Sequence, residues 1–120
     1  MMERFHVTER DLEGGVRDVH IEGELDLAVA GQLDEALVKA AEQCQRVLVG
    51  LERCAFIDSS GIAVILRAHT RMQDEGNRLV VYGPTAQVLR VLSMTGLTSN
   101  GLVFDSAAEA LAALSATTEG

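Results

Sequence analysis

The sequence predicts an α/β domain whose mixed sheet has a parallel core and an antiparallel edge. Two short segments of alternating apolar and polar residues open the chain, separated by a glycine-rich turn. From about residue 29 onward, stretches with helical periodicity alternate with short aliphatic runs. Strands that are separated by helices cross over right-handed and lie parallel in one sheet. The predicted order of elements is therefore β-β-α-β-α-β-α-β-α.

The first two predicted strands form a hairpin. Phe5 and Val7 alternate with polar residues in the first strand, and Val19 and Ile21 share one face of the second. The sequence Glu-Gly-Gly at residues 13–15 is a turn signal. Two strands this close together along the chain pair antiparallel.

Four amphipathic helices follow from the spacing of apolar residues. The first spans about residues 29–43, with apolar side chains at Val29, Leu33, Leu37, Ala40, Ala41 and Cys44. The second ends near Gly76, with an apolar stripe of Ile62, Ile65, Leu66, His69 and Met72. On such a stripe, His69 is expected to be a packed residue rather than a general base.

The last two helices also carry recognisable ends. Thr85 caps a third helix that ends at Gly96, and its apolar residues are Val88, Leu89, Val91 and Leu92. The pattern Ser106-x-x-Glu109 is a capping box that opens an alanine-rich fourth helix.

Three aliphatic runs predict the remaining strands. Residues 47–51 are apolar without interruption, so we expect a central strand that is covered on both faces. Residues 79–82 form a second buried strand, stopped by Gly83 and Pro84, and residues 102–104 form a last short strand.

The composition predicts one domain over residues 1–120, with a core over about residues 5–112 and a tail that frays from Ser115. Hydrophobic residues make up 48% of the chain but include only three Phe and one Tyr, which predicts an aliphatic core. The longest apolar run, residues 62–66, is far shorter than the ~20 residues that span a membrane. The first thirty residues lack the apolar segment of a secretory signal, so we expect a cytoplasmic protein.

The charge of the chain argues against two classes of partner. The net charge is −8, and residues 1–60 hold six basic and thirteen acidic residues. Nucleic acids and anionic membranes bind proteins that neutralise their phosphates with Lys and Arg. We therefore expect no nucleic acid and no membrane as partner, and a partner protein with a basic patch instead.

The two cysteines, Cys44 and Cys54, are too few and too widely spaced for a zinc site. They flank the predicted central strand, whose residues 46–51 advance ~3.3 Å each, so that roughly 17 Å separates its ends. A disulfide needs Cα atoms within ~7 Å. We therefore predict reduced thiols and no intramolecular disulfide.

Motifs of several enzyme classes are missing from the sequence. The exit of the central strand reads Cys-Ala-Phe-Ile-Asp-Ser-Ser-Gly over residues 54–61, and neither serine lies in the G-x-S-x-G pattern of a serine hydrolase. No P-loop and no G-x-G-x-x-G pattern occurs. A response-regulator receiver needs a lysine after its last strand, whereas the only lysine is Lys39, in the first helix. The sequence thus favours a binding module without metal or cofactor over an enzyme.

Two polar motifs, taken alone, predict only helix caps. Ser59 or Ser60 would accept hydrogen bonds from unpaired N–H groups at the start of the second helix. In the Gly-Glu-Leu-Asp segment that closes the second strand, Gly23 predicts a bend, Glu24 an exposed side chain and Asp26 a cap of the first helix.

The combination of motifs resembles the STAS family. Gly-Glu-Leu-Asp at 23–26, Phe-Ile-Asp-Ser-Ser-Gly-Ile at 56–62 and Met-Thr-Gly-Leu at 94–97 occur in the order and spacing of that family, and the resemblance covers about residues 5–112. More narrowly, they resemble the bacterial anti-sigma factor antagonists. The resemblance implies a single STAS domain that sequesters an anti-sigma factor, itself an ATP-dependent serine kinase, and so frees a sigma factor to activate transcription.

The resemblance also implies a phosphorylation switch at Ser59, the first serine after the aspartate, with Ser60 as the alternative. A serine phosphatase would reset this switch. The implied partner-binding residues are Glu24, Asp26, Asp58, Ser60, Gly61 and Ile62. A phosphate adds about −1.5 to −2 charge at a helix N-terminus, which the helix dipole tolerates, so we expect the fold to survive phosphorylation. The alternative is a scaffolding STAS subunit of a stress-sensing or lipid-transport complex, with no phosphorylation switch.

Overall fold

A five-stranded mixed sheet forms the centre of the protein. The computed structural model describes residues 5–99 and 101–115. The strands lie side by side in the order in which they follow one another along the chain: β1 (Phe5–Leu12), β2 (Val16–Leu25), β3 (Arg46–Ile57), β4 (Arg78–Tyr82) and β5 (Val103–Phe104). β1 pairs antiparallel with β2, and every later pair is parallel. The predicted hairpin and parallel core are confirmed.

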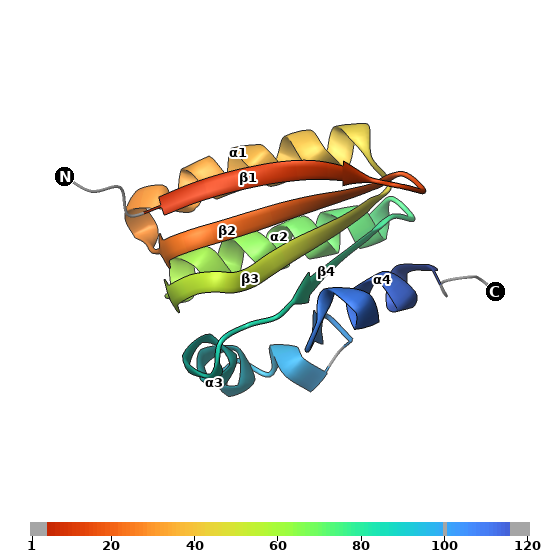
Figure 1. The fold of residues 1–120 in the computed structure, drawn as a ribbon. Coiled ribbons are helices and arrows are strands. Elements are labelled where there is room, and N and C mark those ends of the chain that lie inside the picture. The colour runs from red at the N-terminus through yellow and green to blue at the C-terminus, as the bar shows by residue number, and fades with distance from the viewer. Residues whose placement is uncertain (1–4, 100, 116–120) are drawn as a thin grey trace.

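Helices cover both faces of the sheet, but unequally. The helices are α1 (Leu27–Gln43), α2 (Ser59–Asp74), α3 (Ala86–Met94) and α4 (Ala107–Ser115), and a short 3₁₀ turn, η1, spans Leu97–Ser99. α1 and α2 lie along one face, whereas α4 lies on the other (Figure 1). Among the described residues, no helix is both long enough and apolar enough to cross a membrane.

The core is split by the sheet into two clusters. The larger one joins the sheet to α1, α2 and α3 and includes Val47 and Val49 of β3. The smaller one lies under α4 and includes Leu48 of the same strand. Because successive side chains of a strand point to opposite faces, this part of β3 is covered on both sides, as its unbroken apolar run predicts.

The central strand is longer than the sequence predicts. β3 continues to Ile57 rather than stopping near Leu51, and Cys54 is therefore a buried residue within the strand instead of lying beyond it. The pairing of β3 with β2 contains two register shifts. Such bulges disturb the two-residue alternation by which a strand is recognised. Both cysteines are free in the structure, and the absence of a disulfide between them in oxidised protein stays a prediction.

Smaller differences concern the helices. α1 begins at Leu27, two residues before the predicted start, because Asp26 caps it. The apolar spacing predicts that Leu66 lies on the buried stripe of α2, but its side chain is 37% exposed. His69 is a packed residue as predicted, since its Nδ1 lies 3.0 Å from the carbonyl oxygen of Leu79.

Candidate functional site

The two polar motifs meet at one end of the sheet. β2 and β3 are parallel neighbours, and their last residues, Leu25 and Ile57, pair directly. The backbone N–H of Asp58 also donates to the carbonyl oxygen of Leu25 at 3.2 Å. The starts of α1 and α2 therefore lie beside each other beyond the carboxyl ends of the strands, where open α/β sheets place their functional sites.

Asp58, and neither serine, caps α2. Its carboxylate oxygen Oδ1 accepts hydrogen bonds from the backbone N–H groups of Ser60, at 2.9 Å, and Gly61, at 3.3 Å. The prediction that Ser59 or Ser60 caps this helix is therefore wrong. A carboxylate serves as well as a hydroxyl at this position and its charge complements the helix dipole. Ser59, the first residue of α2, is exposed, and Ser60 is half-buried.

Gly61 and Ile62 lie beneath the surface rather than on it. A Cβ atom at Gly61 would lie only 2.5 Å from Cγ of Leu25, so the first turn of α2 packs directly on the end of β2. Ile62 is 8% exposed and belongs to the larger core cluster. Both residues position the turn that carries Ser59, and the expectation that they contact a partner stays a prediction.

The Gly-Glu-Leu-Asp motif forms the second half of the site. Oδ1 of Asp26 accepts from the backbone N–H of Ala28 at 3.0 Å and caps α1, as the sequence predicts. Gly23 has a φ of 101°, a conformation that side chains disfavour, and Glu24 is exposed. Glu24, Asp26 and Asp58 thus place three carboxylates at the end of the sheet that carries Ser59.

The buried cysteine near this end is chemically quiet. The thiol of Cys54 donates to the carbonyl oxygen of Phe56, with 3.3 Å between sulfur and oxygen. Desolvation by burial raises the pKa of this thiol. A protonated, buried thiol is a poor nucleophile and a poor metal ligand, and no group of His, Cys, Asp and Glu in the described residues is arranged to hold a metal ion.

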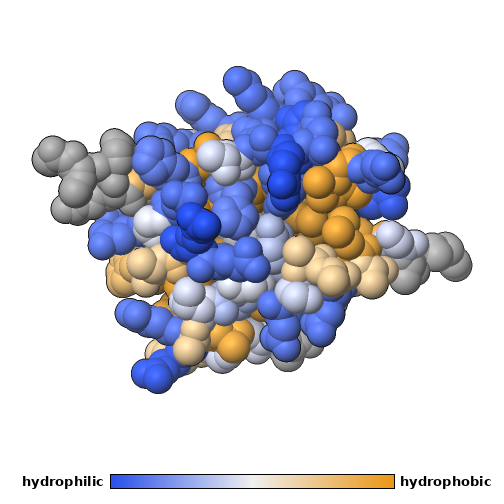
Figure 2. Space-filling view, in the orientation of Figure 1, coloured by the Kyte–Doolittle hydropathy of each residue, from blue (hydrophilic) through white to orange (hydrophobic). Residues whose placement is uncertain are grey.

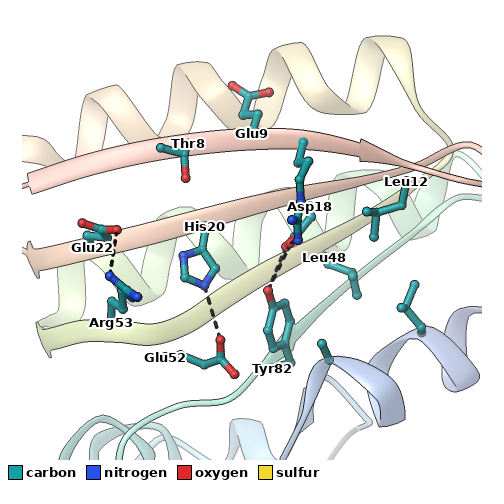
Figure 3. Close-up of a pocket in the computed structure, with 13 residues that line it drawn as sticks. Thr8, Glu9, Leu12, Asp18, His20, Glu22, Leu48, Glu52, Arg53 and Tyr82 are labelled. Atoms are coloured by element: carbon teal, nitrogen blue, oxygen red, sulfur yellow. Dashed lines mark hydrogen bonds and ion pairs between the residues drawn. The ribbon is translucent and has the colours of Figure 1, made fainter.

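A second polar region, which no local sequence pattern predicts, lies on the part of the sheet that α4 leaves open. Polar side chains cover most of this face, with apolar ones gathered toward the end near α4 (Figure 2). A hollow of about 650 Å³ lies here (Figure 3). Its centre is Asp18, which is only 6% exposed and accepts from the hydroxyl of Tyr82 at 3.0 Å and from Arg10 at 3.4 Å. Desolvation by burial is the largest cause that raises the pKa of Tyr82, and the hydrogen bond to Asp18 is the second.

The remaining polar side chains of the hollow also pair with one another. His20 lies 3.5 Å from Glu52, and Arg53 lies 3.7 Å from Glu22 (Figure 3). At Gly50, a Cβ atom would lie 2.5 Å from the ring of His20 and 2.5 Å from the hydroxyl oxygen of Tyr82. The hollow is therefore organised by bonds within the sheet, and this network ties β2, β3 and β4 together.

The chain is similar to known proteins of one family. Residues 8–104 match the family model described as "Mlab, STAS domain". An anti-sigma F factor antagonist of Paenibacillus polymyxa is 34% identical over 83% of this chain and 87% of its own.

Solved structures share the fold. The anti-sigma factor antagonist SpoIIAA in its unphosphorylated form aligns with a TM-score of 0.77 at 19% identity, over 95% of this chain and 100% of its own. The Bacillus cell fate determinant SpoIIAA in the phosphorylated form aligns with a TM-score of 0.70 at 19% identity, over 89% and 97%.

Proposed function

The chain belongs to the STAS domain family, and from this membership we propose that it is an anti-sigma factor antagonist switched by phosphorylation of Ser59. The observation that carries the proposal is the position of Ser59, which is exposed on the first turn of α2 directly after the cap Asp58. The name of the relative from Paenibacillus polymyxa supports the role. The protein acts by binding, without catalysis of its own.

The cap explains how a phosphate acts as a switch without unfolding the domain. The Asp58 carboxylate already accepts from the N–H groups of Ser60 and Gly61, so α2 does not depend on the Ser59 side chain. A phosphate on Ser59 adds about −1.5 to −2 charge beside this carboxylate. Like charges repel, which directs the phosphate outward into the surface that a partner must contact. That SpoIIAA has been solved in unphosphorylated and phosphorylated forms supports a switch of this kind.

The proposed partner is an anti-sigma factor that is itself an ATP-dependent serine kinase, and a serine phosphatase restores the unmodified form. The unmodified protein binds the anti-sigma factor, and a sigma factor is thereby released. The surface around Ser59 consists of Glu24, Asp26, Asp58 and Ser60, while Gly61 and Ile62 support it from below. The carboxylates of this surface suit a basic partner.

Phosphate transfer tests the proposal directly. The purified protein is incubated with ATP and each candidate serine-kinase anti-sigma factor from the same genome, and the site of phosphate is mapped by mass spectrometry. We expect label on Ser59, no label on Ser59→Ala and normal label on Ser60→Ala. Phosphate on Ser60 in the wild type would contradict the assignment.

The second candidate is a scaffolding STAS subunit in which Ser59 is never phosphorylated. The description of the matching family model names Mlab rather than an anti-sigma factor antagonist, and this observation favours the second candidate. It predicts no phosphate transfer from any of the candidate kinases.

A further inference from the structure

Large apolar side chains are exposed at few places in this domain. Among the described residues they are Leu27, at 76% exposed, Phe56, at 41%, Leu66, at 37%, and Met94, at 79%. Leu27 directly follows one of the two motifs that meet at the Ser59 end of the sheet, and Phe56 is the first residue of the other. Exposed apolar side chains that gather around a candidate functional site are a mark of protein contact surfaces.

Backbone pairing fixes the place of both side chains. Leu27 is the first residue of α1 and directly follows the cap Asp26. Phe56 pairs with Glu24 across β2 and β3 and lies two residues before Asp58. An interface of ordinary size covers about 800 Å² of each partner, so one partner that contacts Ser59 can cover both side chains.

Neither side chain is among those that form the two core clusters or pack against them. The next residue of β3, Ile57, is 2% exposed and lies in the core, whereas Phe56 is 41% exposed. At the start of a helix, acidic side chains interact favourably with the dipole, whereas an exposed leucine contributes nothing of that kind. The fold thus leaves most of Leu27 and part of Phe56 exposed to water, where a partner can bury them.

We propose that Leu27 and Phe56 are the apolar anchors by which this protein holds its anti-sigma factor, and that Glu24 and Asp26 form an acidic rim beside them. This inference rests on the proposed function. The complementary surface is an apolar pocket bordered by Lys or Arg, because the protein carries a net charge of −8 and presents carboxylates at this end. In protein interfaces, a few buried anchors carry most of the affinity, and charged rims chiefly govern association.

Anchors and rim have different kinetic effects. Loss of an anchor shortens the life of the complex, because most differences in affinity between variants of one interface lie in the dissociation rate. Loss of a rim charge slows association, and salt masks the difference because it screens exposed charges. A phosphate on Ser59 lies beside the anchors, so closing the interface over them would require the removal of water from a charged group.

The test measures association and dissociation rates of purified candidate serine-kinase anti-sigma factors by surface plasmon resonance. The anchor variants are Leu27→Ala and Phe56→Ala, and Leu12→Ala is their matched control. Leu12 lies beside Val16, at the opposite end of β2. A ten-residue strand spans about 30 Å, which places the control outside the same interface. Glu24→Gln tests the rim, and Glu13→Gln, in the β1–β2 turn, is its control.

We expect each anchor variant to raise Kd at least tenfold through faster dissociation, with both controls within twofold of the wild type. Glu24→Gln should slow association at low salt, and this difference should vanish at high salt. Circular dichroism spectra should remain those of the wild type, because Leu27, Phe56, Glu24 and Glu13 are exposed and Leu12 is only partly buried. If the wild type binds and both anchor variants bind equally well, the inference is overturned while the proposed function stands. If the wild type binds none of the kinases, the proposed function itself fails and the inference with it.

Discussion

Replacing Gly61 by alanine probes the close approach between α2 and the end of β2. A Cβ atom there would lie 2.5 Å from Cγ of Leu25 and 3.2 Å from Cγ1 of Ile57. Both neighbours are core side chains that cannot move into solvent, with exposures of 0% and 2%. Overpacking of a core costs about 1–3 kcal/mol, while alanine gains about 1 kcal/mol over glycine in a helix. The difference predicts that Gly61→Ala lowers the free energy of unfolding by as much as about 2 kcal/mol.

Gly31 is the matched control because it is also helical, but in α1, and a Cβ atom added there meets nothing within 4 Å. Only the gain in helix propensity remains, so Gly31→Ala should raise the free energy of unfolding by about 0.5–1 kcal/mol. Urea denaturation followed by circular dichroism measures both values from the midpoint at constant slope. The expected result is an opposite sign for the two substitutions. Equal stabilisation by both would refute the close contact at Gly61.

A double-mutant cycle with Leu25→Ala separates this contact from any other effect of the substitution. Leu25→Ala alone leaves a cavity and should cost about 2–5 kcal/mol. The added methyl group of Gly61→Ala then finds space, so its penalty should disappear in that background. Additive free energies would show that Leu25 is not the group that opposes the methyl.

Three further predictions concern the charges of the site and of the sheet. Ser59→Asp places a charge where the phosphate would lie and should weaken binding of the anti-sigma factor at least tenfold, or about 1.4 kcal/mol. Its circular dichroism spectrum should not change. If titration calorimetry gives the same affinity for the variant and the wild type, the scaffolding role is favoured. In urea denaturation, Asp58→Ala should lower the free energy of unfolding by about 1 kcal/mol through loss of the cap, and Asp58→Asn should lower it by much less. Equal losses of stability in the two variants would show that the charge of Asp58, rather than its hydrogen bonds, stabilises the helix. Tyr82→Phe leaves the buried Asp18 carboxylate without its hydroxyl donor and should cost about 1–3 kcal/mol at pH 7. The pKa of Tyr82 is raised in the folded state. The wild type should therefore lose stability as the pH rises above about 10, because the tyrosine of the unfolded chain ionises first. The chain has one tyrosine, so a Tyr82→Phe variant with the same alkaline loss of stability would contradict this explanation.

The fold was accessible from the sequence because its elements bury regular sets of side chains. The spacing of Leu33, Leu37 and Ala40 predicts α1, and all three are fully buried. The sequence predicts the strands less accurately where the burial pattern is irregular, as in the second half of β3. There the register shifts against β2, and Glu52 and Arg53 face water. A pattern of apolar residues cannot predict a strand whose partner holds it through the backbone.

The candidate site was predicted less completely, for two physical reasons. Serine and aspartate are nearly equal helix caps, so the sequence could not decide that Asp58 rather than Ser59 occupies this position. The pairing of Asp18 with Tyr82 depends on the register of three strands, which a local pattern does not contain. The exposure of Leu27 and Phe56 likewise depends on which surfaces the helices leave open.

The order of the strands has a consequence for synthesis on the ribosome. Each strand pairs with the one made just before it, from β1 at one edge to β5 at the other. Chains whose contacts are near in sequence fold quickly, and domains emerge N-terminus first. The end of the sheet that carries Ser59 is therefore complete once β3 and α2 have emerged. Tyr82 and Asp18 are 64 positions apart, so their hydrogen bond forms only after β4 has emerged. This bond then connects β4 to β2 across β3.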